Sequence, residues 1–343
     1  MRRSAALLSA TVLLLAATAC SERTPGSSAP VPAAPAAAGS APPVSPAPPA
    51  PASVQANELG SIPVLMYHQL SDHPASVYDR TPADFRAELE RLARENYVPI
   101  TAAQLTSGRI DIPAGAHAVV LTFDDSTNSQ VHLDPKGDPT PDSALGILLD
   151  VSKAHPSFPA RATFFVNSSP FSTSGSDKAL GWLVKHGFEV GNHTLHHSNL
   201  ATLDAAGVQE AIASEQAEIT KAVPGTPVQS LALPYGVMPK PGSLAVHGSV
   251  NGVAYQHRGV YLVGSNPAPS PFDASFDPTA IPRIRSEAAT GSEAEFGSTV
   301  WLDRLAKNPA GRYTSAGDPD HVTFPEAQAA HLAESLRSRA RPY

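Results

Sequence analysis

The feature that most constrains the fold of this chain is a regular alternation of strand-like and helix-like segments. Short apolar runs rich in β-branched and aromatic residues, such as 62–68 and 161–167, precede amphipathic stretches such as 82–96. Strands separated by helices of this length are joined by crossovers, so we expect parallel strands with helices outside them. The expected strands are 62–68, 117–125, 161–167, 188–194, 228–236 and 259–264, and the expected helices are 82–96, 142–154, 178–187, 202–223 and 325–343.

This alternation predicts an α/β fold, but it does not distinguish a closed (β/α) barrel from an open sheet. In both folds, the carboxyl ends of the strands meet at one edge, and active sites form there. The polar residues that end apolar runs are His68, Asp124 with Asp125, Asn167, His193 and Tyr235. We therefore expect these side chains to lie near one another.

The first 57 residues do not have the pattern of a folded domain. Residues 1–20 combine a basic start, an apolar stretch and small residues before Cys20, which is the layout of an export signal. Residues 21–57 are rich in Pro, Ala and Ser, and such a composition predicts an extended, disordered tether. The remaining residues, 58–343, are long enough for one large catalytic domain.

Cys20 is the only cysteine of the chain, so no internal disulfide can form. The sequence "ATAC" resembles the lipobox of bacterial lipoproteins, and lipidation of Cys20 would anchor the protein to the outer face of the cell membrane. Cleavage after Ala19 is the alternative and would give a secreted soluble protein. The chain without residues 1–20 keeps 22 basic and 31 acidic residues, a net charge of −9, which argues against a nucleic-acid partner. The oligomeric state does not follow from the sequence.

Two histidines and an acidic pair have the residue types of a metal site. His193 and His197 are four positions apart, so a helical turn would place both rings on one side, and His196 between them is a rival ligand. Two His and one carboxylate suit Zn²⁺, Co²⁺ or Ni²⁺ and leave positions open for water and substrate. Taken alone, the same histidines would fit a solvated loop better than a metal site.

Three motifs in order, "LTFDD", "NHTLHH" and "LALPYG", resemble the polysaccharide deacetylase family (NodB homology, carbohydrate esterase family 4). The resemblance covers roughly residues 62–285 and implies an irregular (β/α) barrel with a divalent metal. It assigns the metal to Asp125, His193 and His197, the role of general base to Asp124, and the oxyanion-binding backbone N–H to Tyr235.

The chain departs from the family pattern at two motifs. The family usually carries an Arg that orients the base where this chain has Ala232, and "IPRIR" offers Arg283 or Arg285 as a substitute, with Arg283 preferred. The family's general-acid His near the C-terminus has no equivalent in an apolar strand. Instead, His68 follows the strand "VLMY", as in the permuted branch of the family that acts on poly-N-acetylglucosamine, and this resemblance makes His68 the acid.

The function that follows is an exported, Zn²⁺-dependent hydrolase that removes N-acetyl groups from an N-acetylglucosamine-containing polysaccharide. Two alternatives remain at this stage. The missing Arg at Ala232 would suit a catalytically silent glycan-binding lipoprotein on the same fold, and an O-acetyl esterase would use the same site on a substrate such as xylan.

Overall fold

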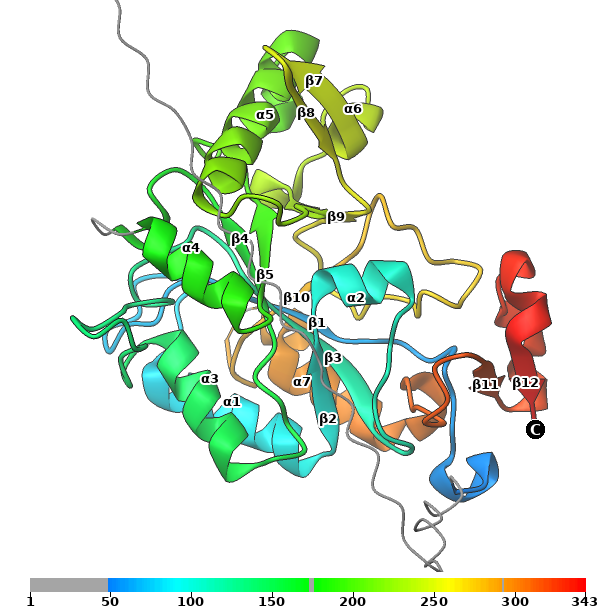
Figure 1. Cartoon of the computed structure of the whole chain (residues 1–343). Coiled ribbons are helices and arrows are strands. Elements are labelled where there is room, and N and C mark those ends of the chain that lie inside the picture. Colours follow the sequence, from blue (N-terminus) through cyan, green and yellow to red (C-terminus); the bar gives the residue numbers. More distant parts are fainter. Residues whose placement is uncertain (1–48, 173–175, 292) are drawn as a thin grey trace, which may run out of the picture. The chain divides into compact units, whose positions relative to one another are not determined.

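A curled parallel sheet lies at the centre of the computed structural model, and helices pack against its outer face (Figure 1). The structure describes residues 49–172, 176–291 and 293–343. None of the helices in these ranges has both the length and the apolar content of a membrane-spanning helix. The sheet strands are β1 (Val64–Tyr67), β2 (Tyr97–Ile100), β3 (His117–Phe123), β4 (Thr163–Val166), β5 (Glu189–Asn192), β6 (Ser230–Ala232), β9 (Gly259–Tyr261) and β10 (Ile284–Arg285).

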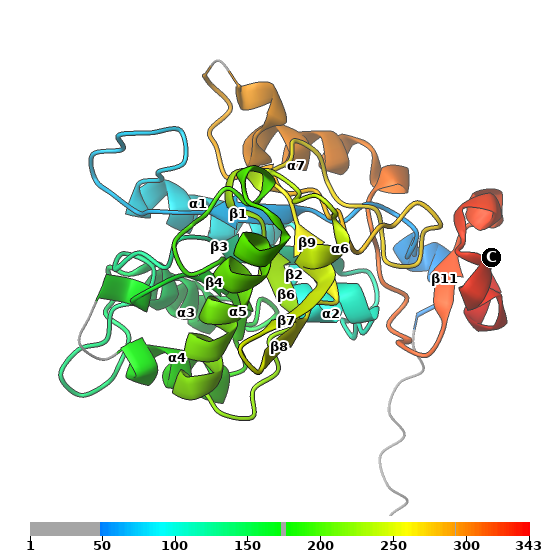
Figure 2. The same ribbon diagram turned by 90° about the horizontal axis from the view of Figure 1, so that it is seen from above.

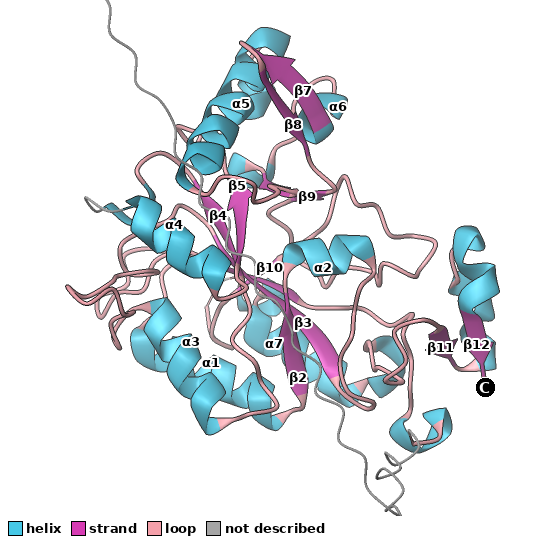
Figure 3. Cartoon of the chain, in the orientation of Figure 1, coloured by secondary structure: helices cyan, strands magenta, loops and turns pink. Residues whose placement is uncertain are grey.

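The remaining elements surround this sheet (Figure 3). The helices are α1 (Pro82–Arg94), α2 (Ala102–Ser107), α3 (Ala144–Ala154), α4 (Ser176–Lys185), α5 (Ala205–Ala222), α6 (Ser243–Val246) and α7 (Ser298–Lys307). Strands β7 (His247–Val250) and β8 (Val253–Gln256) form an antiparallel hairpin beside α5, and β11 (Val322–Phe324) pairs with β12 (Ala340–Pro342) in a separate parallel pair.

The strand order β10-β1-β3-β4-β5-β6-β9, with β2 paired to β3, is parallel throughout. The two ends of this sheet are joined through one segment, residues 281–285. Ile281 forms a parallel bridge with Tyr261 of β9, and Ile284 pairs with Leu65 of β1. The sheet therefore closes, and the expected irregular (β/α) barrel is confirmed over the open sheet.

The strands separate two clusters of buried apolar side chains. Leu121 and Phe164 belong to the cluster that includes the buried faces of α1, α3, α4 and α7, so they point outward. Val120 and Phe165, one position away, belong to a second cluster without those helices and point into the barrel. Because side chains alternate along a strand, Asp124 lies on the same inward side as Val120. Figure 2 shows the helices of the outer layer around the sheet from above.

Several helices begin where the sequence supplies a capping side chain. Thr81, Ser143 and Asp204 each accept a hydrogen bond from the backbone N–H three residues further on, at the starts of α1, α3 and α5. Because these caps fix where each helix begins, they also fix the lengths of the loops that lead from the strand ends into the helices.

The prediction of a helix over 325–343 is wrong. This segment forms two short 3₁₀ turns, Glu326–His331 and Glu334–Arg339, followed by β12. Tertiary contacts decide the outcome, because β12 pairs with β11 and the backbone N–H of Ala333 bonds to the carbonyl of Phe272. No predicted element covered β2, α2, the β7–β8 hairpin or α7, which are short or lie within turn-rich sequence.

The expected boundary at residue 58 is several residues too late. Pro51–Val54 forms a 3₁₀ turn, Ala56 is fully buried, and the backbone of Asn57 pairs with Thr314. Residues 51–57 are thus part of the folded unit and not of a tether. The expected signal at 1–20, Cys20 and the greater part of the 21–57 segment lie outside the described residues.

Candidate active site

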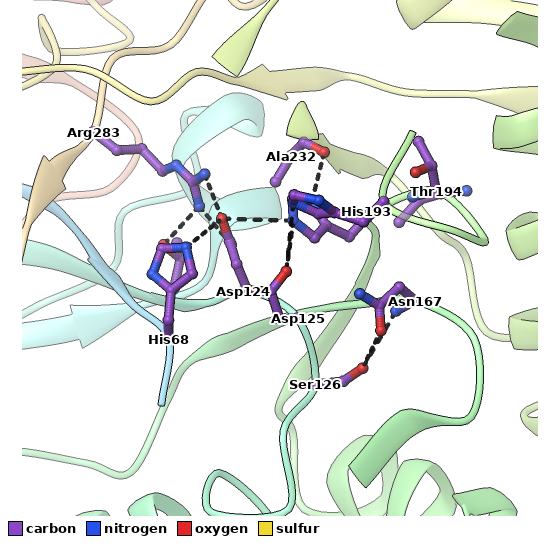
Figure 4. A network of polar contacts seen from close by, with 12 residues as sticks. His68, Asp124, Asp125, Ser126, Asn167, His193, Thr194, Ala232 and Arg283 are labelled. Carbon is purple, nitrogen blue, oxygen red and sulfur yellow. Dashed lines mark hydrogen bonds and ion pairs between the residues drawn. The ribbon is translucent and has the colours of Figure 1, made fainter. Parts of the chain in front are cut away.

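The carboxyl ends of the strands bring five expected site residues into one cluster (Figure 4). His68 follows β1, Asp124 and Asp125 follow β3, and His193 follows β5. His197 enters from the loop after His193. Asn167, at the end of β4, lies to one side, where its side chain bonds the hydroxyl of Ser126.

Asp125, His193 and His197 form a group that could hold a metal ion, with ligand atoms within 4.8 Å of one another. Asp125 Oδ1 lies 3.4 Å from His193 Nε2 and 3.5 Å from His197 Nε2. His193 Nδ1 lies 2.9 Å from the carbonyl oxygen of Ala232, to which only a protonated nitrogen can bond. In the neutral ring, Nε2 therefore carries the lone pair and faces the group, and it is buried without a hydrogen-bond partner. A donor set of this kind fits a divalent transition metal.

The two histidines meet through an irregular loop and not through the helical turn that their spacing suggested. Thr194 and His197 have positive φ angles of 61° and 51°, so the chain reverses between the rings. His196, the rival ligand, faces the opposite way, into a separate cavity of about 560 Å³ that Glu215 also lines. That cavity contains none of the three candidate ligands, although it is the larger of the two.

Positive φ angles of non-glycine residues are concentrated at this site. Of the ten that the described residues contain, five lie in or beside the cluster: Asp125, Ser126, Thr194, His197 and Tyr235. Such conformations are unfavourable for residues with a Cβ and persist where the surroundings enforce them, which is common at functional sites.

Asp124 forms a buried ion pair with Arg283. The guanidinium donates two hydrogen bonds to the carboxylate, of 2.7 Å to Oδ1 and 2.6 Å to Oδ2, and both side chains are almost completely buried. Burial alone would raise the pKa of Asp124, but Arg283, with His193 and His68, lowers this pKa well below its usual range. Asp124 is therefore ionised at neutral pH.

Of the two arginines that the sequence offered, Arg283 is the one that contacts Asp124. It lies on the segment that closes the barrel, inside the barrel, where it also donates to the Leu262 carbonyl. Arg285 instead pairs with Glu287 and Glu293. Position 232, where the family has its Arg, is a buried Ala on β6, so the cation reaches Asp124 from a different strand.

His68 lies on the other side of Asp124 from the metal group. Its Nε2 is 4.0 Å from Asp124 Oδ2, and its Nδ1 is buried without a partner. Burial lowers the pKa of His68, although Asp124 and Asp125 oppose this shift. The two C-terminal candidates lie elsewhere: His321 contacts Asp318, and His331 is largely exposed beside Asp273.

A cleft of about 300 Å³ opens over these residues. Two partly exposed tyrosines line it: Tyr78, which is 38% exposed and contacts the ring of His68, and Tyr235, which is 61% exposed and contacts the ring of His197. Tyr235, with φ 59°, is the second residue of the short 3₁₀ segment Pro234–Gly236 that follows β6. A barrel mouth with a possible metal site beside an ionised carboxylate is typical of metal-assisted hydrolases.

Comparison with known proteins finds a family model that matches part of the chain. Residues 111–245 match the family model described as polysaccharide deacetylase. A chitooligosaccharide deacetylase of Bradyrhizobium sp. (strain ANU 289) is 28% identical over 178 residues, which are 50% of this chain and 72% of that protein. Residues 111–245 are thus similar to polysaccharide deacetylases, which are hydrolases, as the sequence motifs predicted.

Solved structures agree on the fold. The Streptococcus pyogenes deacetylase PplD superposes with a TM-score of 0.50 at 17% identity, covering 68% of this chain and 96% of that one. A polysaccharide deacetylase from Bacillus cereus gives 0.51 at 20% identity, covering 68% and 67%. The matched segment 111–245 contains Asp124, the three candidate ligands and Tyr235, whereas His68 and Arg283 lie outside it.

Proposed function

We propose that this protein is an exported, metal-dependent deacetylase that hydrolyses the N-acetyl groups of an N-acetylglucosamine-containing polysaccharide, either an exopolysaccharide or peptidoglycan. The observation that carries the proposal is the convergence of Asp125, His193 and His197 with the Asp124–Arg283 pair and His68 in one cleft. These groups are the ones that hydrolysis of an acetamide needs: a metal, a base and an acid.

Asp125, His193 and His197 would hold the cation, and Zn²⁺ is the metal that this donor set favours, with Co²⁺ and Ni²⁺ as alternatives. When bound, the cation would polarise the acetamide carbonyl and make the attacking water more acidic. The hydrogen bond from His193 to the Ala232 carbonyl would hold this ring in the tautomer that binds metal.

Asp124 and His68 would divide the proton transfers. Asp124 is kept ionised and oriented by Arg283, so it can accept the proton of the attacking water. His68 Nε2 lies 4.0 Å from Oδ2 of the same carboxylate, and His68 lines the cleft, so it can donate a proton to the leaving amine. The position of His68 before the acidic pair favours the permuted branch of the family.

Tyr235 would contribute to stabilising the oxyanion through its backbone. Its N–H lies in the first turn of a short 3₁₀ segment, where N–H groups have no partner within the segment, and Tyr235 lines the cleft. The rings of Tyr78 and Tyr235 would provide apolar faces on which a sugar can pack.

The proposal extends to the cellular location. Residues 1–20 would direct export, Cys20 would carry a lipid at the outer face of the membrane, and the Pro-rich segment that follows would separate the domain from the surface. Cleavage after Ala19, giving a secreted soluble protein, is the competing outcome. The mass of the mature N-terminus from cells that express the full chain distinguishes the two.

The test of activity is release of acetate from N-acetylglucosamine oligomers and from peptidoglycan, with Zn²⁺ or Co²⁺ added. We expect Asp124→Asn to lower kcat by about 10²–10⁴-fold, the range for loss of a general base. Equal rates in wild type and variant would contradict the proposal. Acetylated xylan as a parallel substrate separates N-deacetylation from O-acetyl esterase activity.

The silent glycan-binding alternative rested on the missing Arg at position 232. Because Arg283 occupies the corresponding place beside Asp124, this departure no longer favours a silent protein. Binding of chitin oligomers without turnover, in the presence of metal, would restore that alternative.

A further inference from the structure

The loop after the acidic pair contains Gln130, whose side chain contacts the backbone of both His68 and Asp124. Gln130 is 0% exposed, although it belongs to the loop 126–142 between β3 and α3, in which only Ser126 and Val131 are buried besides it. Its side-chain nitrogen Nε2 donates to the backbone carbonyl of His68, at 2.8 Å, and to the backbone carbonyl of Asp124. A single amide group thus joins the ends of β1 and β3.

The orientation of this amide is fixed by its partners. Both neighbours are backbone carbonyl oxygens, which only accept hydrogen bonds, so the atom between them must be the NH₂ group and not the amide oxygen. That NH₂ has two hydrogens, one for each carbonyl. A carboxylate at the same place would present no donor, and an apolar side chain would leave both carbonyls without this bond.

The bridge lies where the sheet no longer holds the two strands together. Tyr67 and Phe123 are the last paired residues of β1 and β3, followed by one bond from the Asp124 N–H to the Tyr67 carbonyl. Beyond that point the chains diverge, to His68 on one side and Asp125 on the other. The two bonds from Gln130 take the place of the next bonds of the ladder.

Gln130 is itself held firmly. Its backbone N–H bonds to the Thr127 carbonyl, and its own carbonyl accepts from the N–H of Leu145 in the first turn of α3. The neighbouring Ser129 accepts from the Leu70 N–H at 2.9 Å, which ties the same loop to the chain after His68. The loop therefore connects the helix start to both strand ends.

We propose that Gln130 is a positioning residue that sets the separation of His68 and Asp124, and hence the geometry of proton transfer. The proposal rests on the proposed roles of these two residues. Few polar contacts hold the His68 side chain, because its Nδ1 is buried without a partner, its Nε2 is 4.0 Å from the carboxylate, and its ring otherwise contacts that of Tyr78. Displacements of about 1 Å can lower a rate by about 100-fold.

The variant Gln130→Met keeps the length and volume of the side chain and removes its donors. We expect kcat for acetate release to fall about 10- to 100-fold, with KM changed less than threefold, because the substrate-facing surface is intact. Binding of Co²⁺ should stay within about threefold, since Gln130 contacts none of the three candidate ligands. The control Gln256→Met replaces an exposed glutamine of β8 and should match wild type.

Positioning is distinguished from general destabilisation by a double-mutant cycle. If Gln130 acts through His68, Gln130→Met should cost clearly less in a His68→Ala background than in the wild-type background. Full additivity of the two effects, or a kcat for folded Gln130→Met within threefold of wild type, would overturn the proposal. An equal loss of Co²⁺ affinity would do the same, because it would indicate collapse of the whole site.

A second measurement does not depend on turnover. The imidazole NMR signals of His68, assigned by their loss in His68→Ala, should shift in Gln130→Met and stay unchanged in Gln256→Met. Unchanged signals in both variants would refute the positioning role even if no substrate is found. Absence of acetate release by the wild-type protein, together with a shifted His68 signal, would count against the proposed function and leave the positioning role supported.

Discussion

The ion pair between Asp124 and Arg283 allows a quantitative test of how this barrel holds its base. The variant Arg283→Met removes a buried cation that donates at 2.7 and 2.6 Å to the carboxylate and at 2.7 Å to the Leu262 carbonyl. The carboxylate left behind lies in a site closed to solvent. Removing one partner of such a pair costs about 3–5 kcal/mol, and the extra lost bond places our expectation near the upper end.

Urea unfolding of the purified domain without metal measures this cost. A domain of this size has a free energy of unfolding of about 5–15 kcal/mol, so the variant should lose a large part of it and unfold at a much lower urea midpoint with an unchanged slope. Arg285→Met is the comparison variant, because Arg285 pairs with two separate carboxylates, Glu287 and Glu293, and keeps 13% of its side chain exposed against 0% for Arg283, so its loss should be smaller. Equal losses in the two variants would refute the reasoning.

The Asp124–Arg283 ion pair also leads us to expect that a second substitution can restore part of the activity lost in Arg283→Met. Arg283→Met should lower kcat about 10- to 100-fold, because Asp124 loses the group that orients it. Adding Ala232→Arg, which places a cation where related sequences carry one, should recover part of kcat. A double variant no better than Arg283→Met would show that position 232 cannot serve Asp124 in this barrel.

Three further outcomes are expected. His197→Ala should weaken Co²⁺ binding at least 100-fold in a calorimetric titration, whereas His196→Ala, which alters a ring facing the other cavity, should change it less than about threefold; equal effects would contradict the assignment. Tyr235→Phe should keep kcat within about threefold, because the proposed donor is the backbone N–H, and a loss of 100-fold would assign the role to the hydroxyl. Burial, with a smaller contribution from Glu218, raises the pKa of Glu215 from 4.5 to about 8. The folded state thus retains this proton, and its stabilising contribution is complete below pH 4.5 and lost as pH rises through 8. The free energy of unfolding of the wild type should therefore fall by on the order of a few kcal/mol between pH 6 and 9, and Glu215→Gln should abolish this fall. Parallel pH profiles of the two proteins would argue against this burial effect.

The sequence predicted those parts of the fold that local pattern determines. The strands that contain long apolar runs, such as β3, and the helices with a regular apolar face, such as α1 and α5, lie within a few residues of their expected bounds. The strand β2 escaped notice because it has four residues, one of them Pro99, and is strand-like only beside β3. The segment 325–343 has a helical composition, but its pairing with β11 overrides that preference.

Among the site residues as well, those within a local motif were predicted, whereas one that tertiary contacts place was not. Asp125, His193 and His197 were found because each belongs to a short motif at a strand end. Gln130 was not found, since nothing in a polar loop indicates that one amide turns inward to two backbone carbonyls. Its only sequence signal is its place in the long loop that directly follows the acidic pair.

The sequence by itself therefore determined the order of the longer strands and helices up to β9, the likeness to a deacetylase and the candidate metal ligands, because these depend on short local patterns. Only the tertiary structure decided which arginine serves Asp124. Arg283 reaches the carboxylate because Ile281 and Ile284 join β9 to β1 and close the barrel. The contact between Arg283 and Asp124 links residues 159 positions apart, and no local pattern encodes it.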